Sequence, residues 1–359
     1  MEFASSNWTW ETLEPPEITK PMQSQLVSLR KTAALLVLWA GVGLGAWARA
    51  DMPRVQTNDA RERQEAVRGL DLLMDGDLKG AIEVFHQIQQ GDPQSPLGYL
   101  LEADALWWRI YYSTANLIDP DVFAATDLLA TPYDAHFQDL LDMTMRTAEA
   151  RVHANQDVAR NYLYWGMAYG LRGRLFGLRD KDLPTARAGK RMRTLLLRAL
   201  DADPNLTDAY LGIGIYNYFV DTLSAIVKVL AWLIRLPGGS RTEGLRQLQL
   251  AADKGELARA EAKFFLAKDY SRSNERQYAK SIRLFEEIAR EYPHNPLWPM
   301  LIGSLHFRMG EREQGEASYR EVYRRTAERK SEVDEALHKA SREALQRLHP
   351  GQEIESLFH

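Results

Sequence analysis

Apolar residues recur at helical spacing in two segments of the chain that lie 200 positions apart. One is GDLKGAIEVFHQIQQGDPQSP, which begins at Gly76, and the other is RQYAKSIRLFEEIAREYPHNP, which begins at Arg276. Positions i, i+4 and i+7 carry small or large side chains that share one face of an α-helix. A proline follows and ends each helix, because it has no N–H to donate and clashes with the preceding turn. The matching positions are Ala81, Phe85, Ile88 and Pro93 in the first segment, and Ser281, Phe285, Ile288 and Pro293 in the second.

The same pattern returns in three further segments, each with another predicted helix upstream. Glycine stands in upstream helices at Gly69, Gly166, Gly212 and Gly303. Because glycine destabilises a helix interior, glycines at matching places indicate that two helices approach closely there. The sequence therefore predicts an all-α chain built of helical hairpins. The further segments carry the pattern at Met192, Leu196, Ala199 and Pro204, at Gly244, Leu248 and Ala251, and at Gly315, Tyr319 and Val322.

This order of small, aromatic and proline positions resembles the tetratricopeptide repeat (TPR) family. The first unit carries it at Gly69, Ala81, Phe85 and Pro93. The resemblance implies a TPR-like right-handed α-solenoid of about six helical hairpins. The chain departs from the motif at Asp269, which stands where a small residue belongs, and most units lack the opening tryptophan.

Within that family the chain looks most like exported bacterial TPR proteins of unknown role. It shares with them the order LGIGIYNYFVD, LPGGSRTEGL, AKFFLAKDY and YPHNPLW. More loosely, the arrangement is similar to the tetratricopeptide repeat protein 39 family of eukaryotes. Neither likeness implies a known chemistry.

The repeat pattern divides the chain into three parts. Residues 51–327 are expected to form the solenoid, with inserts near residues 113–132, 172–186 and 220–242. Residues 328–359 are expected to form a C-terminal helix and tail. A terminal helix with a polar back is needed to cover the last hydrophobic face of a solenoid, and this segment is amphipathic.

Residues 1–50 are expected to be a polar leader followed by a secretory signal peptide that begins at Met22. Two basic residues precede an apolar stretch, residues 32–48, and small residues at Ala48 and Ala50 are candidate cleavage positions. The segment predicts that the protein is exported, and in a bacterium the destination would be the periplasm. The alternative is an uncleaved N-terminal membrane anchor, although the apolar stretch would span only about 25 Å of a hydrocarbon core about 30 Å thick.

The most apolar run in the body of the chain is YFVDTLSAIVKVLAWLIRLPGGSR, residues 218–241. Its densest part, residues 223–236, would be only about 21 Å long as a helix, too short for a membrane span. The spacing instead predicts an inserted amphipathic helix, or an extension of the preceding one. Such a helix either folds over the groove as a lid or provides a membrane or partner contact. The residues that would make this contact are Ile226, Leu230, Trp232 and Leu233.

Composition and motifs argue against several kinds of site. The chain of 359 residues has a formal net charge of −4, so no nucleic-acid partner is expected. It has no cysteine, which excludes disulfides and thiol catalysis. It carries no recognised catalytic motif, and its eight histidines are scattered, with none paired at i, i+4. We therefore expect no enzymatic activity, no metal and no cofactor.

In TPR proteins the first helix of each unit lines a concave groove in which peptides or partner helices dock. An asparagine in the groove can hydrogen-bond a peptide backbone, and a tyrosine can pack against a ligand. The alternative is that these side chains fill the space between helices, with the asparagine finding a partner on a neighbouring helix. By the phase of the motif, the groove candidates are Leu163 and Met167 in one unit, and Ile213, Tyr216 and Asn217 in the next.

Two arginine-rich stretches, GLRGRLFGLRDK and ARAGKRMRTLLLR, suit acidic partners or lipid headgroups, but a solvated helix face is the favoured interpretation. Together, these features predict a non-catalytic exported scaffold that binds a peptide or partner protein in its concave groove. The alternative is a membrane-peripheral or lipid-handling protein that uses the apolar helix of residues 223–236.

Overall fold

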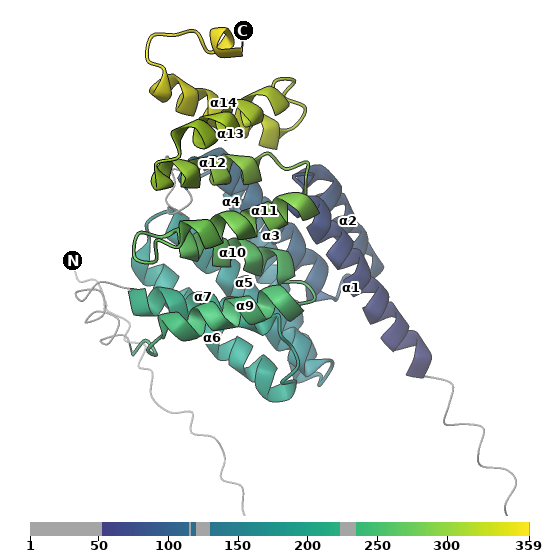
Figure 1. Cartoon of the computed structure of the whole chain (residues 1–359). Helices are drawn as coiled ribbons and strands as arrows, with labels where there is room; N and C mark the ends of the chain where they lie inside the picture. Colours follow the sequence, from purple (N-terminus) through teal and green to yellow (C-terminus); the bar gives the residue numbers. More distant parts are fainter. Residues whose placement is uncertain (1–51, 115, 120–129, 223–234, 359) are drawn as a thin grey trace, which may run out of the picture. The chain divides into compact units, whose positions relative to one another are not determined.

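Every regular element that the structure describes is a helix. The computed structural model describes residues 52–114, 116–119, 130–222 and 235–358, and none of these forms a β-strand. The helices are shown in Figure 1. They are α1 (Met52–Met74), α2 (Leu78–Gly91), α3 (Pro96–Thr114), α4 (Asp134–His153), α5 (Val158–Leu178), α6 (Asp182–Ala202), α7 (Ala209–Thr222), α9 (Arg241–Lys254), α10 (Arg259–Ser271), α11 (Tyr278–Glu291), α12 (Leu297–Met309), α13 (Arg312–Arg325), α14 (Glu332–Leu348) and a final 3₁₀ turn, η1 (Ile354–Phe358).

Consecutive helices pack against each other along the chain, from α2 on α3 to α13 on α14. The described residues thus form six helical hairpins, α1/α2, α3/α4, α5/α6, α7/α9, α10/α11 and α12/α13, followed by α14. The all-α solenoid of about six hairpins that the sequence predicts is therefore confirmed.

Glycine allows the two helices of a hairpin to approach closely, as the sequence indicates. A Cβ atom on Gly69 of α1 would lie 2.3 Å from the Phe85 ring of α2. A Cβ atom on Gly303 of α12 would lie 2.9 Å from the Ser318 Cβ atom of α13 and 3.0 Å from the carbonyl oxygen of Gly315. Non-bonded carbon atoms prefer separations of about 3.5–4.0 Å, so no larger side chain fits at these crossings without movement.

The insert expected near residues 172–186 is part of a hairpin. Both α5 and α6 are 21 residues long, and only a short turn, Arg179–Lys181 in sequence, separates them. The two helices extend past the length of a TPR helix and pack along each other. The other two expected inserts contain residues outside the described part of the chain. The same holds for the expected leader and signal peptide, and for the contact residues Ile226, Leu230, Trp232 and Leu233.

Helix α3 lies at the centre of the packing. It contacts α2 and α4, its neighbours in sequence, and also α5 and α14. Trp107, Trp108 and Tyr111 are fully or almost fully buried, and the Trp108 ring lies 5.1 Å from the ring of Phe264 in α10. The aromatic residues of α3 thus join hairpins that are more than 150 residues apart in sequence.

The first hairpin also contacts the turn between α11 and α12, and Figure 1 shows α1 and α2 beside the end of α11. Asn295 is buried in this turn. Its Nδ2 atom donates hydrogen bonds to the Met74 carbonyl oxygen at 2.9 Å and to the Tyr112 hydroxyl at 3.1 Å. Its Oδ1 atom accepts from the backbone N–H of Leu297 at 3.0 Å, which satisfies one of the free N–H groups at the start of α12. One side chain therefore joins the C-terminal ends of α1 and α3 to the start of α12.

The last helix covers the end of the array. Helix α14 packs on α13, and Ser331 begins it by accepting a hydrogen bond from the Asp334 backbone N–H at 3.1 Å. Val333, Leu337 and Leu345 are buried on its inner face. Arg109 of α3 donates to the carboxylate of Glu332 at 2.7 Å, which ties the start of α14 to the central helix.

Candidate functional site

A cavity of about 830 Å³ opens between the inner sides of the hairpins. Its walls come from the first helices of five hairpins, α1, α3, α5, α7 and α10, and from α6. The cavity therefore lies on the side formed by the first helices, where the sequence predicts a groove. Its volume is in the range of about 300–1,000 Å³ that is typical of ligand pockets in proteins.

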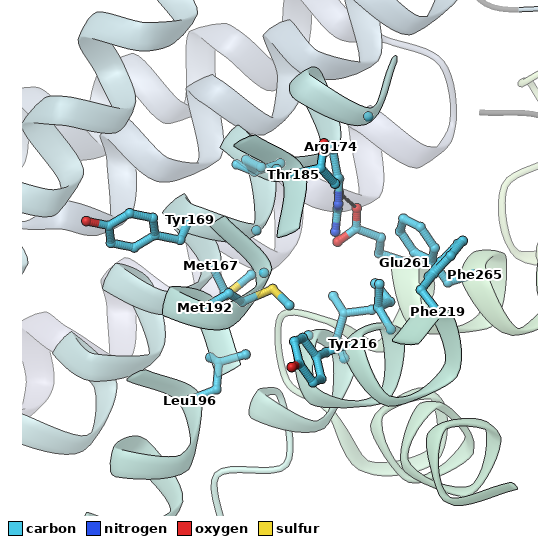
Figure 2. A pocket seen from close by; sticks show the side chains of 18 of the residues that line it. Met167, Tyr169, Arg174, Thr185, Met192, Leu196, Tyr216, Phe219, Glu261 and Phe265 are labelled. Carbon is cyan, nitrogen blue, oxygen red and sulfur yellow. Dashed lines mark hydrogen bonds and ion pairs between the residues drawn. The ribbon is translucent and has the colours of Figure 1, made fainter. Parts of the chain in front are cut away.

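Most of the cavity wall is apolar. Figure 2 shows Met167 of α5 and Met192 of α6 at its centre, with Leu196 and Tyr216 nearby and Phe219 facing Phe265. Methionine side chains are unbranched and adapt to the shape of a ligand, which suits a site that receives apolar groups of varied form. The wall offers few polar groups, and three charged side chains from different helices meet at one place in it.

A buried charged group interrupts the apolar wall. Arg174 of α5 forms an ion pair with Glu261 of α10, marked by a dashed line in Figure 2. Its guanidinium also lies 4.7 Å from the centre of the Phe265 ring and 5.4 Å from that of Trp107. These contacts hold the arginine in place from both sides, in the manner of a cation–π interaction.

Asp104 of α3 is the third charged member of this group, and its interaction with Arg174 is longer than a hydrogen bond. Its Oδ1 atom lies 3.7 Å from Arg174 and has no hydrogen-bond partner. Burial raises the pKa of Asp104 well above its usual range, the Glu261 carboxylate raises it further, and Arg174 opposes the shift. Two carboxylates therefore share one guanidinium, and Asp104 is the one left without a close partner.

Two of the predicted groove residues line this cavity. Met167 contributes to its wall, as does Tyr216, whose hydroxyl donates to the Pro237 carbonyl oxygen at 2.6 Å. The guanidinium of Arg193 lies 5.5 Å from the centre of the Tyr216 ring. Both residues stay predicted ligand contacts.

The other three predicted residues lie in the packing between helices. Leu163 and Ile213 are 1% and 2% exposed. Asn217 is buried and donates from its Nδ2 atom to the Oε1 atom of Gln247 in α9 at 2.8 Å. The polar partner that a buried amide needs is thus supplied by a neighbouring helix, and none of these three residues lines the cavity.

The arginine-rich stretch after Gly170 is not a uniformly solvated face. Arg174 lines the cavity with a side chain that is only 16% exposed, and Arg179 is buried and donates to Asp134 at the start of α4 at 3.1 Å. The group formed by Arg174, Asp104 and Glu261 was missed from the sequence, because its members lie on three helices that are far apart in the chain. No spacing signal in the sequence links them.

A second polar cluster lies between α2, α3 and α4. The buried Glu102 carboxylate lies 2.9 Å from the Nε2 atom of His86 and 3.0 Å from the Nε2 atom of His136, and it accepts from Gln89 at 2.7 Å. Burial favours the neutral acid, but the hydrogen bonds from Gln89, His86 and His136 outweigh it and lower the pKa of Glu102. The cluster joins three consecutive helices.

The described residues lack two kinds of feature. No group of three or more histidine, aspartate or glutamate side chains there has an arrangement that could hold a metal ion. Among the helices described, none combines the length and the apolar character that crossing a membrane requires.

No protein-family model matches the chain, and a search of curated proteins gave no match. Among solved structures, the chain is similar to a thermophilic TPR protein of Thermus thermophilus, with 14% sequence identity and a TM-score of 0.39. The match covers 68% of this chain and 99% of that one. The hairpin architecture of this protein is established by its own helix packing.

Proposed function

We propose that this protein is an exported, non-catalytic scaffold whose inner cavity receives an apolar anchor from a peptide or partner protein. The observation that carries the proposal is the apolar cavity of about 830 Å³, lined by the first helices of five hairpins. Burial of apolar surface supplies about 25 cal/mol per Å² removed from water, so a few aliphatic or aromatic side chains are enough to anchor a partner.

A variant that fills the cavity tests the proposal. Ala186 of α6 lines the cavity and is half-buried, so Ala186→Phe places a ring in the space that an anchor would occupy. Ala150 of α4 is exposed and outside the cavity, and Ala150→Phe is the matched control. Both variants and the wild type are purified with a tag from a bacterial envelope extract after chemical cross-linking.

The expected result is a defined partner that is captured by the wild type and by Ala150→Phe, and lost or strongly reduced with Ala186→Phe at unchanged melting temperature. Equal capture by all three proteins would place the partner on another surface and overturn the proposal. Export is tested separately by the intact mass of protein recovered from the periplasm. We expect an N-terminus close to Ala48 or Ala50, and retention of the complete leader would support the anchored alternative.

A membrane-peripheral or lipid-handling role is the second candidate. The apolar lining of the cavity favours it, because a hydrocarbon chain needs no hydrogen bonds from its site. Flotation of the mature protein with liposomes distinguishes the two roles. Absence of the protein from the lipid fraction would remove this candidate.

A further inference from the structure

The wall of the cavity is apolar except at Arg174, Glu261, Asp104 and a few residues of the α5–α6 turn and the end of α10. We propose that the anchor received by the cavity carries an aliphatic ammonium group, from a lysine of an apolar segment, and that this group binds Asp104. The inference rests on the proposed function, and it names the chemistry of the partner at the same site.

The first step of the argument is charge. Arg174 is a single positive charge among two carboxylates, and its close ion pair is with Glu261. Asp104 remains 3.7 Å away with its Oδ1 atom unbonded, so this group of three side chains has an acceptor oxygen that Arg174 does not satisfy. A buried carboxylate without a hydrogen bond is costly, and a cationic donor removes that cost.

The second step is shape. Asp104 lines the cavity together with its α3 neighbours Leu100 and Leu101, and with Leu70 and Met74 of α1. A lysine has an aliphatic stem of four carbons that packs on apolar surface and a compact ammonium group with three donors at its end. This combination matches an apolar wall in which one carboxylate, that of Asp104, has no close ion pair. A guanidinium is the poorer match, because its five donors need several acceptors.

The third step is the protonation state. Burial, and after it the Glu261 carboxylate, raise the pKa of Asp104, so the neutral acid is favoured in the empty cavity more than it is for an exposed aspartate. An ammonium group binds the carboxylate form, so binding releases a proton from Asp104. Affinity for an amine is therefore expected to increase with pH until the amine itself loses its proton, near a pKa of about 10.4. A neutral ligand of the same length has no such dependence.

Three ligands of equal chain length test the inference: decylamine, decanol and decanoate, each below its micelle concentration, in titration calorimetry with the full chain. We expect decylamine to bind at least about tenfold more tightly than decanol, since a charge-assisted hydrogen bond to a buried group contributes that much. Decanoate is expected to bind most weakly. Decylamine affinity should increase with pH as long as the amine stays protonated, with proton release measured in buffers of different ionisation enthalpy.

Asp104→Asn is the decisive variant, with Glu149→Gln of the exposed face of α4 as the matched control. Loss of a buried, unbonded carboxylate should leave the melting temperature unchanged or higher. We expect Asp104→Asn to reduce the preference for decylamine over decanol to less than about threefold, while decanol affinity is retained. The control should keep the preference of the wild type.

The outcomes separate the inference from the proposed function. Equal affinity for decylamine and decanol in the wild type overturns the ammonium assignment but leaves an apolar anchor site in place. A preference for decanoate overturns it as well. In a second arm, vesicles of phosphatidylethanolamine and phosphatidylglycerol are floated with wild type and Asp104→Asn. Flotation that depends on Asp104 would assign the ammonium to a lipid headgroup and overturn the lysine assignment.

Discussion

Replacement of Asn295 by alanine tests whether the first hairpin is held by the turn between α11 and α12. The side chain has three partners, the Met74 carbonyl, the Tyr112 hydroxyl and the Leu297 N–H. Each hydrogen bond contributes about 1 kcal/mol net, and the partners left behind are buried, so we expect Asn295→Ala to lower the free energy of unfolding by about 3 kcal/mol or more. For a domain of this size that corresponds to a decrease in melting temperature of about 6 °C.

The assay is urea unfolding followed by circular dichroism at 222 nm, together with hydrogen exchange of the amides of α1 and α2. Two further variants separate the contributions. Asn295→Ser keeps an oxygen that can accept from Leu297 but does not reach Met74, so its loss should be smaller by about 1 kcal/mol. Asn205→Ala removes an exposed asparagine and should stay within about 0.5 kcal/mol of the wild type.

Faster exchange in α1 and α2 of Asn295→Ala, with α5 and α6 unchanged, would show that the first hairpin loosens first. The reasoning is refuted if Asn295→Ala loses less than about 1 kcal/mol. In that case the bonds between residues 74 and 295 would contribute nothing to the stability of the array.

Three other predictions concern the packing and the buried charges. Gly303→Ala brings a Cβ atom within 3.0 Å of α13 and should cost about 1–3 kcal/mol in urea unfolding, whereas Gly91→Ala, which meets no atom within 4 Å, should be neutral or slightly stabilising. The depressed pKa of Glu102 means that its stabilisation is complete above the unfolded value of about 4.5 and is lost as pH falls through the folded value. The difference in unfolding free energy between wild type and Glu102→Gln should therefore be constant above about pH 5.5 and decrease towards about pH 3, and a difference independent of pH would contradict the assignment. Arg174→Met leaves the Glu261 carboxylate buried without its partner and should cost about 3–5 kcal/mol, and adding Glu261→Leu should recover part of that loss. A double variant that is less stable than Arg174→Met alone would show that the ion pair is not the reason for the loss.

The repeat fold could be predicted because its signals are local. Ala81, Phe85 and Ile88 follow one another at helical spacing on one face of α2, and all three are buried there. Gly69 and Gly303 marked close helix crossings that the structure shows. Such patterns depend on residues within two helical turns of each other, so they survive in a single sequence.

The cavity could be predicted only in part, because its composition depends on long-range packing. The motif phase correctly placed first helices on the inner side, and two of its five candidates line the cavity. The motif phase did not show that Leu163, Ile213 and Asn217 pack between neighbouring helices. It gave no sign that Asp104 and Glu261 meet Arg174, because a charged residue on an amphipathic helix is normally solvated. Which charged side chains become buried depends on how the hairpins pack against each other. The residue spacing within a single hairpin does not show that packing.

The bonds between residues 74 and 295 also change how the protein is expected to fold. In an ordinary repeat array each unit contacts only its neighbours, so stability is a sum of local terms and units can be added or removed at the ends. Here Asn295, and the aromatic residues of α3, join units that lie more than 150 residues apart in the sequence. Contacts of such long sequence separation form late and slow the folding reaction. A cavity that takes its walls from both α1 and α10 is then complete only after the distant hairpins have met. Loss of the first hairpin by truncation or proteolysis would open this cavity, rather than simply shorten the array.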